Sequence, residues 1–185
     1  MSVYRSQDDG KTWQKIDVTI RPDTRGNVPS MHMNEHGITL RHGKHVGRLI
    51  RAARHYGEAN YPKEHWPTHY STAIYSDDRG KTWKTSKPFA EMGTGEAGIV
   101  ELSDGRLYYN VRSHWNAKKP PLRRREAWSN DGGETWTSYR IVEILPDGPQ
   151  GTNYGCFAGL IRLPIAGRDI VLYSNCDSPS GRSHG

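Results

Sequence analysis

Two side chains of opposite charge, Glu96 and Arg112, have the types and the spacing that could do chemistry. A guanidinium group binds carboxylates through paired, planar, charge-assisted hydrogen bonds, and a glutamate carboxylate can act as a general base. Either residue alone is typical of an ordinary role, the glutamate as a turn cap and the arginine in a surface ion pair. Together, 16 residues apart (112 minus 96), they are a candidate anion-binding pair.

A β-hairpin is predicted to position this pair. Gly98–Leu102 has the pattern of a strand, Ser103–Gly105 that of a tight turn, and Arg106–Arg112 that of the returning strand. Because side chains alternate along a strand, the returning strand should have two different faces. One face is expected to carry Arg106, Tyr108, Asn110 and Arg112, and the other Leu107, Tyr109 and Val111.

An eight-residue pattern, S-x-D-x-G-x-T-W, occurs three times without a mismatch, at Ser6–Trp13, Ser76–Trp83 and Ser129–Trp136. In each copy the Asp carboxylate is predicted to accept backbone N–H groups of a tight turn, and the Gly to adopt a conformation that side chains resist. The Trp is expected to pack under that turn. A catalytic role for the aspartates is disfavoured because copies in separate units cannot share one site. The pattern therefore indicates one structural unit used repeatedly.

The composition favours a globular protein made of many short strands. Of 185 residues, 34% are hydrophobic, and 6 Trp, 10 Tyr, 20 Gly and 11 Pro supply bulky core material and turns. The net charge is +6, but the basic residues are scattered. One dense basic cluster, Lys118–Lys119 followed by Arg123–Arg125, is interrupted by two prolines and is typical of a solvated loop, so no nucleic-acid partner is predicted. No apolar run is long enough for a membrane span, and no secretory segment is visible near Met1.

The repeats resemble the Asp boxes of sialidases and related bacterial neuraminidase repeat proteins, whose fold is a six-bladed β-propeller. The resemblance implies an all-β chain, namely a partial six-bladed β-propeller of four-stranded antiparallel blades. Each box then joins the third and fourth strands of a blade. Residues 1–185 are expected to form a single incomplete propeller domain, with the end of one blade at 1–20, blades at 36–88 and 95–143, and the start of the next at 155–185.

The resemblance also implies roles for individual residues. Gly93–Arg112 is similar to a sialidase segment in which a Glu precedes a strand and an Arg closes the next one. Glu96 is thereby expected to assist a tyrosine nucleophile, and Arg112 to be one of three arginines that hold the substrate carboxylate. Leu172–Arg182 is similar to a later sialidase stretch, which makes Arg182 another of these arginines. Sialic acid suits such a site because its carboxylate is a fixed anion that would repel a carboxylate nucleophile.

Other residues that could do chemistry are weaker candidates. Four histidines lie close together, at His32, His36, His42 and His45. Their spacing fits none of the usual structural zinc patterns, so no metal site is predicted. Tyr154 is interpreted as a packing or pocket residue, because the tyrosine nucleophile of the family follows the last arginine. Cys156 and Cys176 flank a predicted hairpin and form either a bridge or two buried thiols, and Cys176 stands where the family frequently has proline.

The expected function is that of an interior portion of an exo-α-sialidase, itself secreted or periplasmic. Such an enzyme hydrolyses terminal sialic acids from glycoconjugates with retention, through a Tyr-linked intermediate and with no metal or organic cofactor. The upstream Arg and Asp and the downstream Tyr of the family pattern are expected to lie outside residues 1–185. The chain alone is therefore expected to be inactive, and as a piece of a propeller to associate or to melt at low temperature.

Two alternatives stay open at this point. Asp boxes also occur in non-catalytic propellers that bind glycans or proteins. A relative that acts on a different acidic sugar is also possible, because paired arginines recognise a carboxylate and not the glycerol tail of sialic acid. Geometry separates the enzyme from the binding protein, since the enzyme requires Glu96, Arg112 and Arg182 to converge on one cavity.

Overall fold

The computed structural model describes residues 3–30, 35–56, 68–113, 123–147 and 157–175. These residues form β-strands and one short 3₁₀ turn, so the expectation of an all-β chain is confirmed. The elements, in chain order, are β1 (Val3–Arg5), β2 (Gln14–Ile16), β3 (Thr19–Ile20), β4 (Ile38–Thr39), η1 (Gly43–His45), β5 (Leu49–His55), β6 (Tyr70–Ser76), β7 (Thr82–Thr85), β8 (Thr94–Glu101), β9 (Leu107–Ser113), β10 (Arg123–Ser129), β11 (Thr137–Pro146), β12 (Gly159–Ile165) and β13 (Arg168–Ser174).

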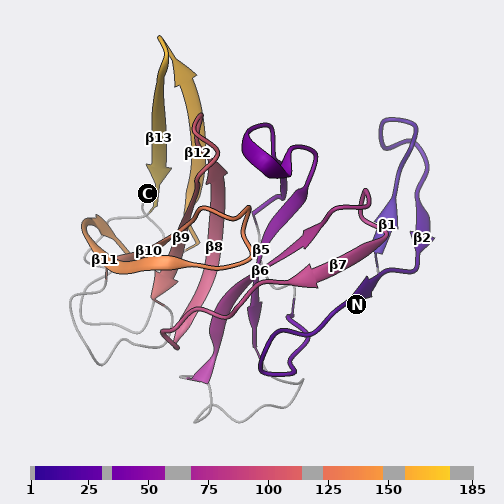
Figure 1. Cartoon of the computed structure of the whole chain (residues 1–185), viewed down its shortest axis with the longest axis horizontal. Helices are drawn as coiled ribbons and strands as arrows, with labels where there is room; N and C mark the ends of the chain where they lie inside the picture. Colours follow the sequence, from indigo (N-terminus) through magenta and orange to yellow (C-terminus); the bar gives the residue numbers. More distant parts are fainter. Residues whose placement is uncertain (1–2, 31–34, 57–67, 114–122, 148–156, 176–185) are drawn as a thin grey trace.

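The strands are organised in two larger sheets and two hairpins. Strands β8, β9, β10 and β11 form an antiparallel sheet in which consecutive strands pair. Strands β4 to β7 pair in the same antiparallel way, and β3 adds a parallel edge next to β7. The hairpins are β1–β2 and β12–β13. In Figure 1 hairpin β1–β2 lies at the right, the five-stranded sheet in the middle and the four-stranded sheet at the left, with hairpin β12–β13 above it. The number of blades and the closure of a ring stay predictions.

The core lies between the two larger sheets. On one face of β9, the side chains of Leu107, Tyr109 and Val111 are fully buried and pack in one cluster with residues of β5 and β6. On its other face Tyr108 packs against Leu160 of β12. The predicted alternation along this strand is confirmed. Both faces are buried because a sheet lies on each side of β9.

The first Asp box forms the predicted turn. Asp8 accepts the backbone N–H of Thr12 at 2.9 Å and its hydroxyl at 2.6 Å, while the Ser6 hydroxyl oxygen accepts the N–H of Gly10 at 2.8 Å. Gly10 has a φ of +84°, which glycine tolerates better than other residues. The hydrogen bonds, with that of the Thr12 hydroxyl the strongest cause, lower the pKa of Asp8 to about 2. The second box has the same contacts at the same distances, so these carboxylates are engaged within their own turns.

The third box differs in that its tryptophan and one of its glycines pack against the neighbouring sheet. In the first two boxes the indole N–H donates to the carbonyl of the box glycine, at 3.1 Å in both. Trp136 donates to the hydroxyl of Ser86 at 3.0 Å, and its ring meets that of Tyr109 edge-on. Gly133 has a φ of +88°, and a Cβ there would lie 2.1 Å from Cδ1 of Ile50 on β5. Only glycine therefore fits this contact between sheets without a shift.

Arg48, just before β5, connects the second box to the third. Its side chain is 4% exposed, and its Nε donates to Asp77 at 2.7 Å. Its Nη2 donates to Glu134 at 3.0 Å, and its Nη1 to the backbone carbonyl of Gly132 at 3.1 Å. One guanidinium thus joins the Asp-box turns of the two larger sheets.

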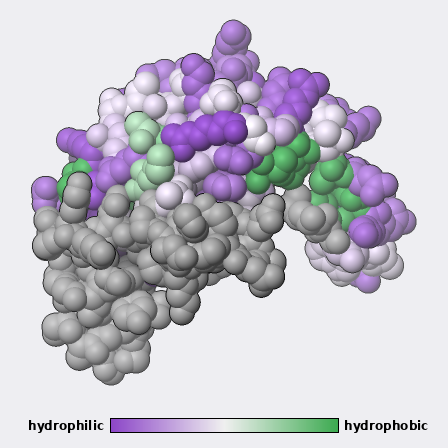
Figure 2. All heavy atoms as spheres, turned by 90° about the horizontal axis from the view of Figure 1, so that it is seen from below, coloured by the Kyte–Doolittle hydropathy of each residue, from purple (hydrophilic) through white to green (hydrophobic). Residues whose placement is uncertain are grey.

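The junction between hairpin β1–β2 and the five-stranded sheet is filled less completely. It contains a pocket of about 310 Å³ whose walls are mainly apolar, formed by residues such as Val3, Val18, Ile20 and Ile74. Figure 2 shows hydrophobic residues gathered toward the end of the molecule where this hairpin lies. Because burying apolar surface is favourable, this junction could accept further apolar packing.

Candidate functional site

A β-bulge at the start of β8 places Glu96. The strand begins at Thr94, earlier than the predicted Gly98, because Thr94 already pairs with Ser113 of β9. The Thr94 hydroxyl oxygen also accepts the backbone N–H of Ser71 at 3.0 Å. Between Thr94 and Ala97 the pairing of β8 with β9 shifts in register. A bulge re-aims the side chains of its residues, and Glu96 lies in this one. The sequence pattern did not predict this irregularity.

The structure brings Glu96 and Arg112 together. Nη1 of Arg112 donates to Oε2 of Glu96 at 2.7 Å, and the two side chains, Arg112 and Glu96, are 6% and 16% exposed, respectively. Nε of Arg112 is buried and makes no hydrogen bond among the described residues. A buried ion pair is weak evidence for a purely stabilising role, so Glu96 and Arg112 remain a candidate site. The roles of the two residues stay predictions.

A third charged residue, Arg54 of β5, belongs to the same cluster. Its Nη1 lies 3.9 Å from Oε1 of Glu96, its side chain is 6% exposed, and its guanidinium lies 4.4 Å from the ring centre of Tyr56. Burial lowers the pKa of Arg54, and burial followed by the charge of Arg54 lowers the pKa of His69 to about 4. The sequence pattern did not single out Arg54. The signal that could have indicated Arg54 is its position after two alanines in a strand, Leu49–His55, which otherwise has the composition of a buried strand at Leu49, Ile50 and the alanines.

A buried network supports the strand end that carries Arg112. Nε of Arg124 donates to the side-chain oxygen of Asn110 at 2.7 Å, and its Nη1 donates to Asp147 at 3.0 Å. The other carboxylate oxygen of Asp147 accepts the backbone N–H of Ser113 at 2.5 Å. Arg124 and Asp147 are only 1% and 0% exposed. The prediction of a solvated loop is therefore wrong for Arg123–Arg125, which begin strand β10. Asn110 and Ser113 lie on either side of Arg112 in β9. Asn110 is therefore held by Arg124 of the adjacent strand β10, and Ser113 by Asp147, the residue after β11.

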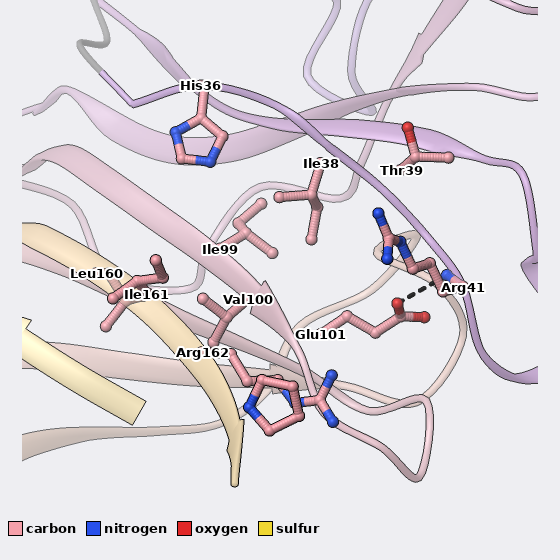
Figure 3. A pocket seen from close by; sticks show the side chains of 11 residues that line it. His36, Ile38, Thr39, Arg41, Ile99, Val100, Glu101, Leu160, Ile161 and Arg162 are labelled. Atoms are coloured by element: carbon pink, nitrogen blue, oxygen red, sulfur yellow. Dashed lines mark hydrogen bonds between the residues drawn. The ribbon is translucent and has the colours of Figure 1, made fainter. Parts of the chain in front are cut away.

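The pocket shown in Figure 3 lies at the opposite end of β8. Its volume is about 390 Å³, and residues of β4, β8 and β12 line it. Glu101 stands at its edge and accepts the backbone N–H of Arg41 at 2.7 Å, the bond drawn dashed in Figure 3. Arg162 is hydrogen-bonded to Asp169. Glu96 does not line this pocket, and the charged side chains Glu101 and Arg162 already have partners within the chain.

Several predicted residues cannot be placed. Arg182, Tyr154, Cys156, Cys176 and His32 lie outside the described residues. Within the described ranges, no three His, Cys, Asp or Glu side chains come together in a way that could hold a metal ion. In the same part of the chain, no helix has the length and apolarity needed to cross a membrane.

Comparisons with known proteins point to one family. The family model described as a BNR repeat-like domain matches residues 1–156. A sialidase of Micromonospora viridifaciens is 33% identical over 189 residues, and a sialidase of Bacteroides fragilis is 27% identical over 186 residues. The NanB sialidase of Streptococcus pneumoniae, solved in complex with 2-[(3-chlorobenzyl)ammonio]ethanesulfonate, superposes with a TM-score of 0.67 at 27% identity.

These similarities cover nearly all of this chain but only part of each relative. The alignments include 100% and 97% of this chain, and 27% and 30% of the Micromonospora and Bacteroides proteins. The superposition with NanB includes 98% of this chain and 24% of that structure. The chain thus spans less than a third of the length of each of these relatives.

Proposed function

This chain belongs to the BNR repeat-like domain family and is related to sialidases, and we propose that it forms part of an exo-α-sialidase that releases terminal sialic acids from glycoconjugates. In the proposal, Arg112 binds the carboxylate of the sugar and Glu96 serves as a base. Arg182 is a further carboxylate ligand in the same proposal. No metal ion or organic cofactor takes part.

The observation that carries the proposal is the buried pair of Glu96 and Arg112. Only one nitrogen of Arg112, Nη1, is hydrogen-bonded to Glu96, and its Nε has no hydrogen-bond partner among the described residues. A guanidinium has five N–H donors, so the remaining donors suit a second carboxylate. An acidic sugar supplies that carboxylate, whereas a neutral sugar offers these donors no charged acceptor.

The proposed reaction proceeds with retention. Glu96 accepts the proton of a tyrosine hydroxyl while that oxygen bonds to the anomeric carbon and the glycosidic bond breaks. Water then attacks the same carbon and releases both the sugar and the tyrosine. The resemblance matches neither this tyrosine nor the acid that protonates the leaving oxygen to a residue of this chain. We therefore expect no turnover by the chain alone.

Binding of the free sugar tests the recognition step. Sialic acid titrated into the full chain should shift NMR signals near β8 and β9, and galactose, a neutral sugar, should not. Replacing Arg112 (Arg112→Met) should weaken binding at least tenfold, because the charge-assisted hydrogen bonds are lost. Arg106→Met is the matched control, since Arg106 is exposed and lies just before the same strand. Binding that Arg112→Met leaves unchanged would contradict the proposal.

Hydrolysis of an aryl sialoside tests the chemical step. The chain alone should release no aryl group, and a longer protein that contains it should be active. In the longer protein Glu96→Gln should lower kcat by about 10²- to 10⁴-fold, the usual contribution of a general base. Glycan binding by the longer protein without hydrolysis would instead support a non-catalytic Asp-box propeller. Preferential hydrolysis of another acidic sugar would replace sialic acid as the substrate.

A further inference from the structure

We propose that Arg54 is a positioning residue for Glu96, whose carboxylate it keeps ionised and oriented between two sheets. The proposed function depends on Glu96 as a base but assigns no role to Arg54. The use of Arg54 in catalysis therefore rests on that function, whereas its effect on the ionisation of Glu96 does not.

The two carboxylate oxygens of Glu96 lie next to two different arginines. Oε2 accepts a hydrogen bond from Arg112 at 2.7 Å, and Oε1 lies 3.9 Å from Nη1 of Arg54. Arg112 belongs to β9 of the four-stranded sheet, whereas Arg54 belongs to β5 of the five-stranded sheet. Strands β5 and β8 are neighbours across the junction of these sheets. Each oxygen thus faces a cation from a different sheet, which restricts rotation of the carboxylate.

The electrostatics follow from the groups that interact with Arg54 and Glu96. Strand β9 contributes Arg112 and Tyr109, and burial raises the pKa of that tyrosine, so it is uncharged. The residue before β6 is His69, which is neutral near pH 7 because its pKa is lowered to about 4. Arg54 and Arg112 are therefore the cations close to Glu96 among the described residues. Both arginines favour the ionised carboxylate, and both are nearly buried, so solvent screens them weakly.

The consequence for the proposed reaction concerns acidic pH. A base can accept the proton of a tyrosine only while it is itself unprotonated. An opposite charge within about 4 to 6 Å lowers the pKa of a carboxyl by about 1 to 3 units. With Arg54 in place, Glu96 should remain a base at lower pH than it would with Arg112 alone.

NMR titration of the full chain tests this inference without any substrate. The side-chain carboxyl signal of Glu96 can be identified in ¹³C-labelled protein by its absence in Glu96→Gln. Arg54→Met should raise the pKa of Glu96 by at least about 1 unit, and Arg54→Lys should restore most of the shift because it restores the charge. An unchanged pKa of Glu96 in folded Arg54→Met would overturn the proposal.

Two further variants complete the test. Arg51→Met is the matched control, because Arg51 lies on the same strand and donates to the backbone oxygen of Glu35 at 3.3 Å. It should leave the titration of Glu96 unchanged. Arg112→Met covers the case in which Arg54→Met does not fold. With Arg54 as the remaining cation among the described residues near Glu96, the pKa of Glu96 should stay below the reference value of about 4.3. A pKa at or above that value would count against Arg54.

The pH profile of a longer, active protein separates this inference from the proposed function. There, Arg54→Met should move the acidic limb of kcat/KM to higher pH, and a purely structural role would lower the whole profile without moving the limb. If the wild-type protein hydrolyses no sialoside, the proposed function fails and the titration result still decides the role of Arg54. If the wild type is active and the limb does not move, the inference fails.

Discussion

Replacing Arg124 by methionine (Arg124→Met) should strongly destabilise the chain. The Arg124 side chain is 1% exposed and pairs with Asp147, which is 0% exposed. Methionine is apolar and fills much of the same space, but it offers no hydrogen-bond donor. The variant therefore leaves the Asp147 carboxylate buried with the backbone N–H of Ser113 as its remaining described hydrogen bond. The side-chain oxygen of Asn110 also loses its donor.

The size of this effect follows from the hydrogen bonds that the substitution removes. Arg124 donates hydrogen bonds of 2.7 Å to Asn110 and 3.0 Å to Asp147. Hydrogen bonds to charged groups contribute about 1.5 to 3 kcal/mol each, and breaking a buried ion pair costs about 3 to 5 kcal/mol. A loss of about 4 kcal/mol in the free energy of unfolding is consistent with both ranges. With a urea m-value of about 2 kcal/mol/M, the unfolding midpoint should fall by about 2 M.

Urea unfolding followed by tryptophan fluorescence measures this loss. The control is Arg106→Met, because Arg106 and Asp104 form an ion pair whose side chains are 51% and 50% exposed. Such a pair contributes only about 0 to 1 kcal/mol. The double variant Arg124→Met/Asp147→Leu removes both buried charges and should be about 2 kcal/mol more stable than Arg124→Met alone. A loss in Arg124→Met no larger than that in the control would refute the reasoning.

Three further outcomes are expected in urea unfolding experiments. Gly133→Ala should lower the free energy of unfolding by about 2 to 5 kcal/mol, the sum of left-handed backbone strain and overpacking against Ile50. Gly26→Ala is the control, because Gly26 has a φ of +82° and open space around it, and it should lose only the strain of about 1 to 2 kcal/mol. Equal losses in the two variants would exclude the overpacking. His69, with a pKa lowered from 6.5 to about 4, should make stability fall as pH drops through that range, because the unfolded chain binds a proton that the folded chain excludes. His69→Gln should flatten this pH dependence, and an unaltered slope of stability against pH would argue against a role of His69. Asp8, with a pKa lowered from 3.8 to about 2, should stabilise the fold above pH 3.8 and lose that effect toward pH 2, a change that Asp8→Asn should lack.

The Asp boxes were predictable from the sequence because their interactions are local. In the first box, the side-chain contacts of Ser6, Asp8, Thr12 and Trp13 join partners that lie two to four residues apart. Hydrogen bonds over such short separations depend on residue type and turn conformation rather than on the rest of the fold. The alternation along β9 was predictable for a similar reason, since the strand geometry alone assigns Tyr108 and Tyr109 to opposite faces.

Contacts between sheets were not predictable in the same way. Arg48 reaches Glu134, and Trp136 reaches Ser86, across separations of 86 and 50 residues. The bulge that aims Glu96 depends on the register between β8 and β9. Nothing in the order of the residues states how one sheet is rotated or shifted against the next. These partners therefore became visible only once the sheets were packed together.

The order of residues was enough to establish a β protein built on repeated Asp-box turns, and to single out Glu96 and Arg112 as a pair. Turn chemistry and strand periodicity act over a few residues, so they can be read without coordinates. Folding added Arg54, which approaches Glu96 from another sheet, and the buried partners of Arg124 that hold the end of β9. Charges interact through space according to distance and burial, and packing in three dimensions sets both quantities.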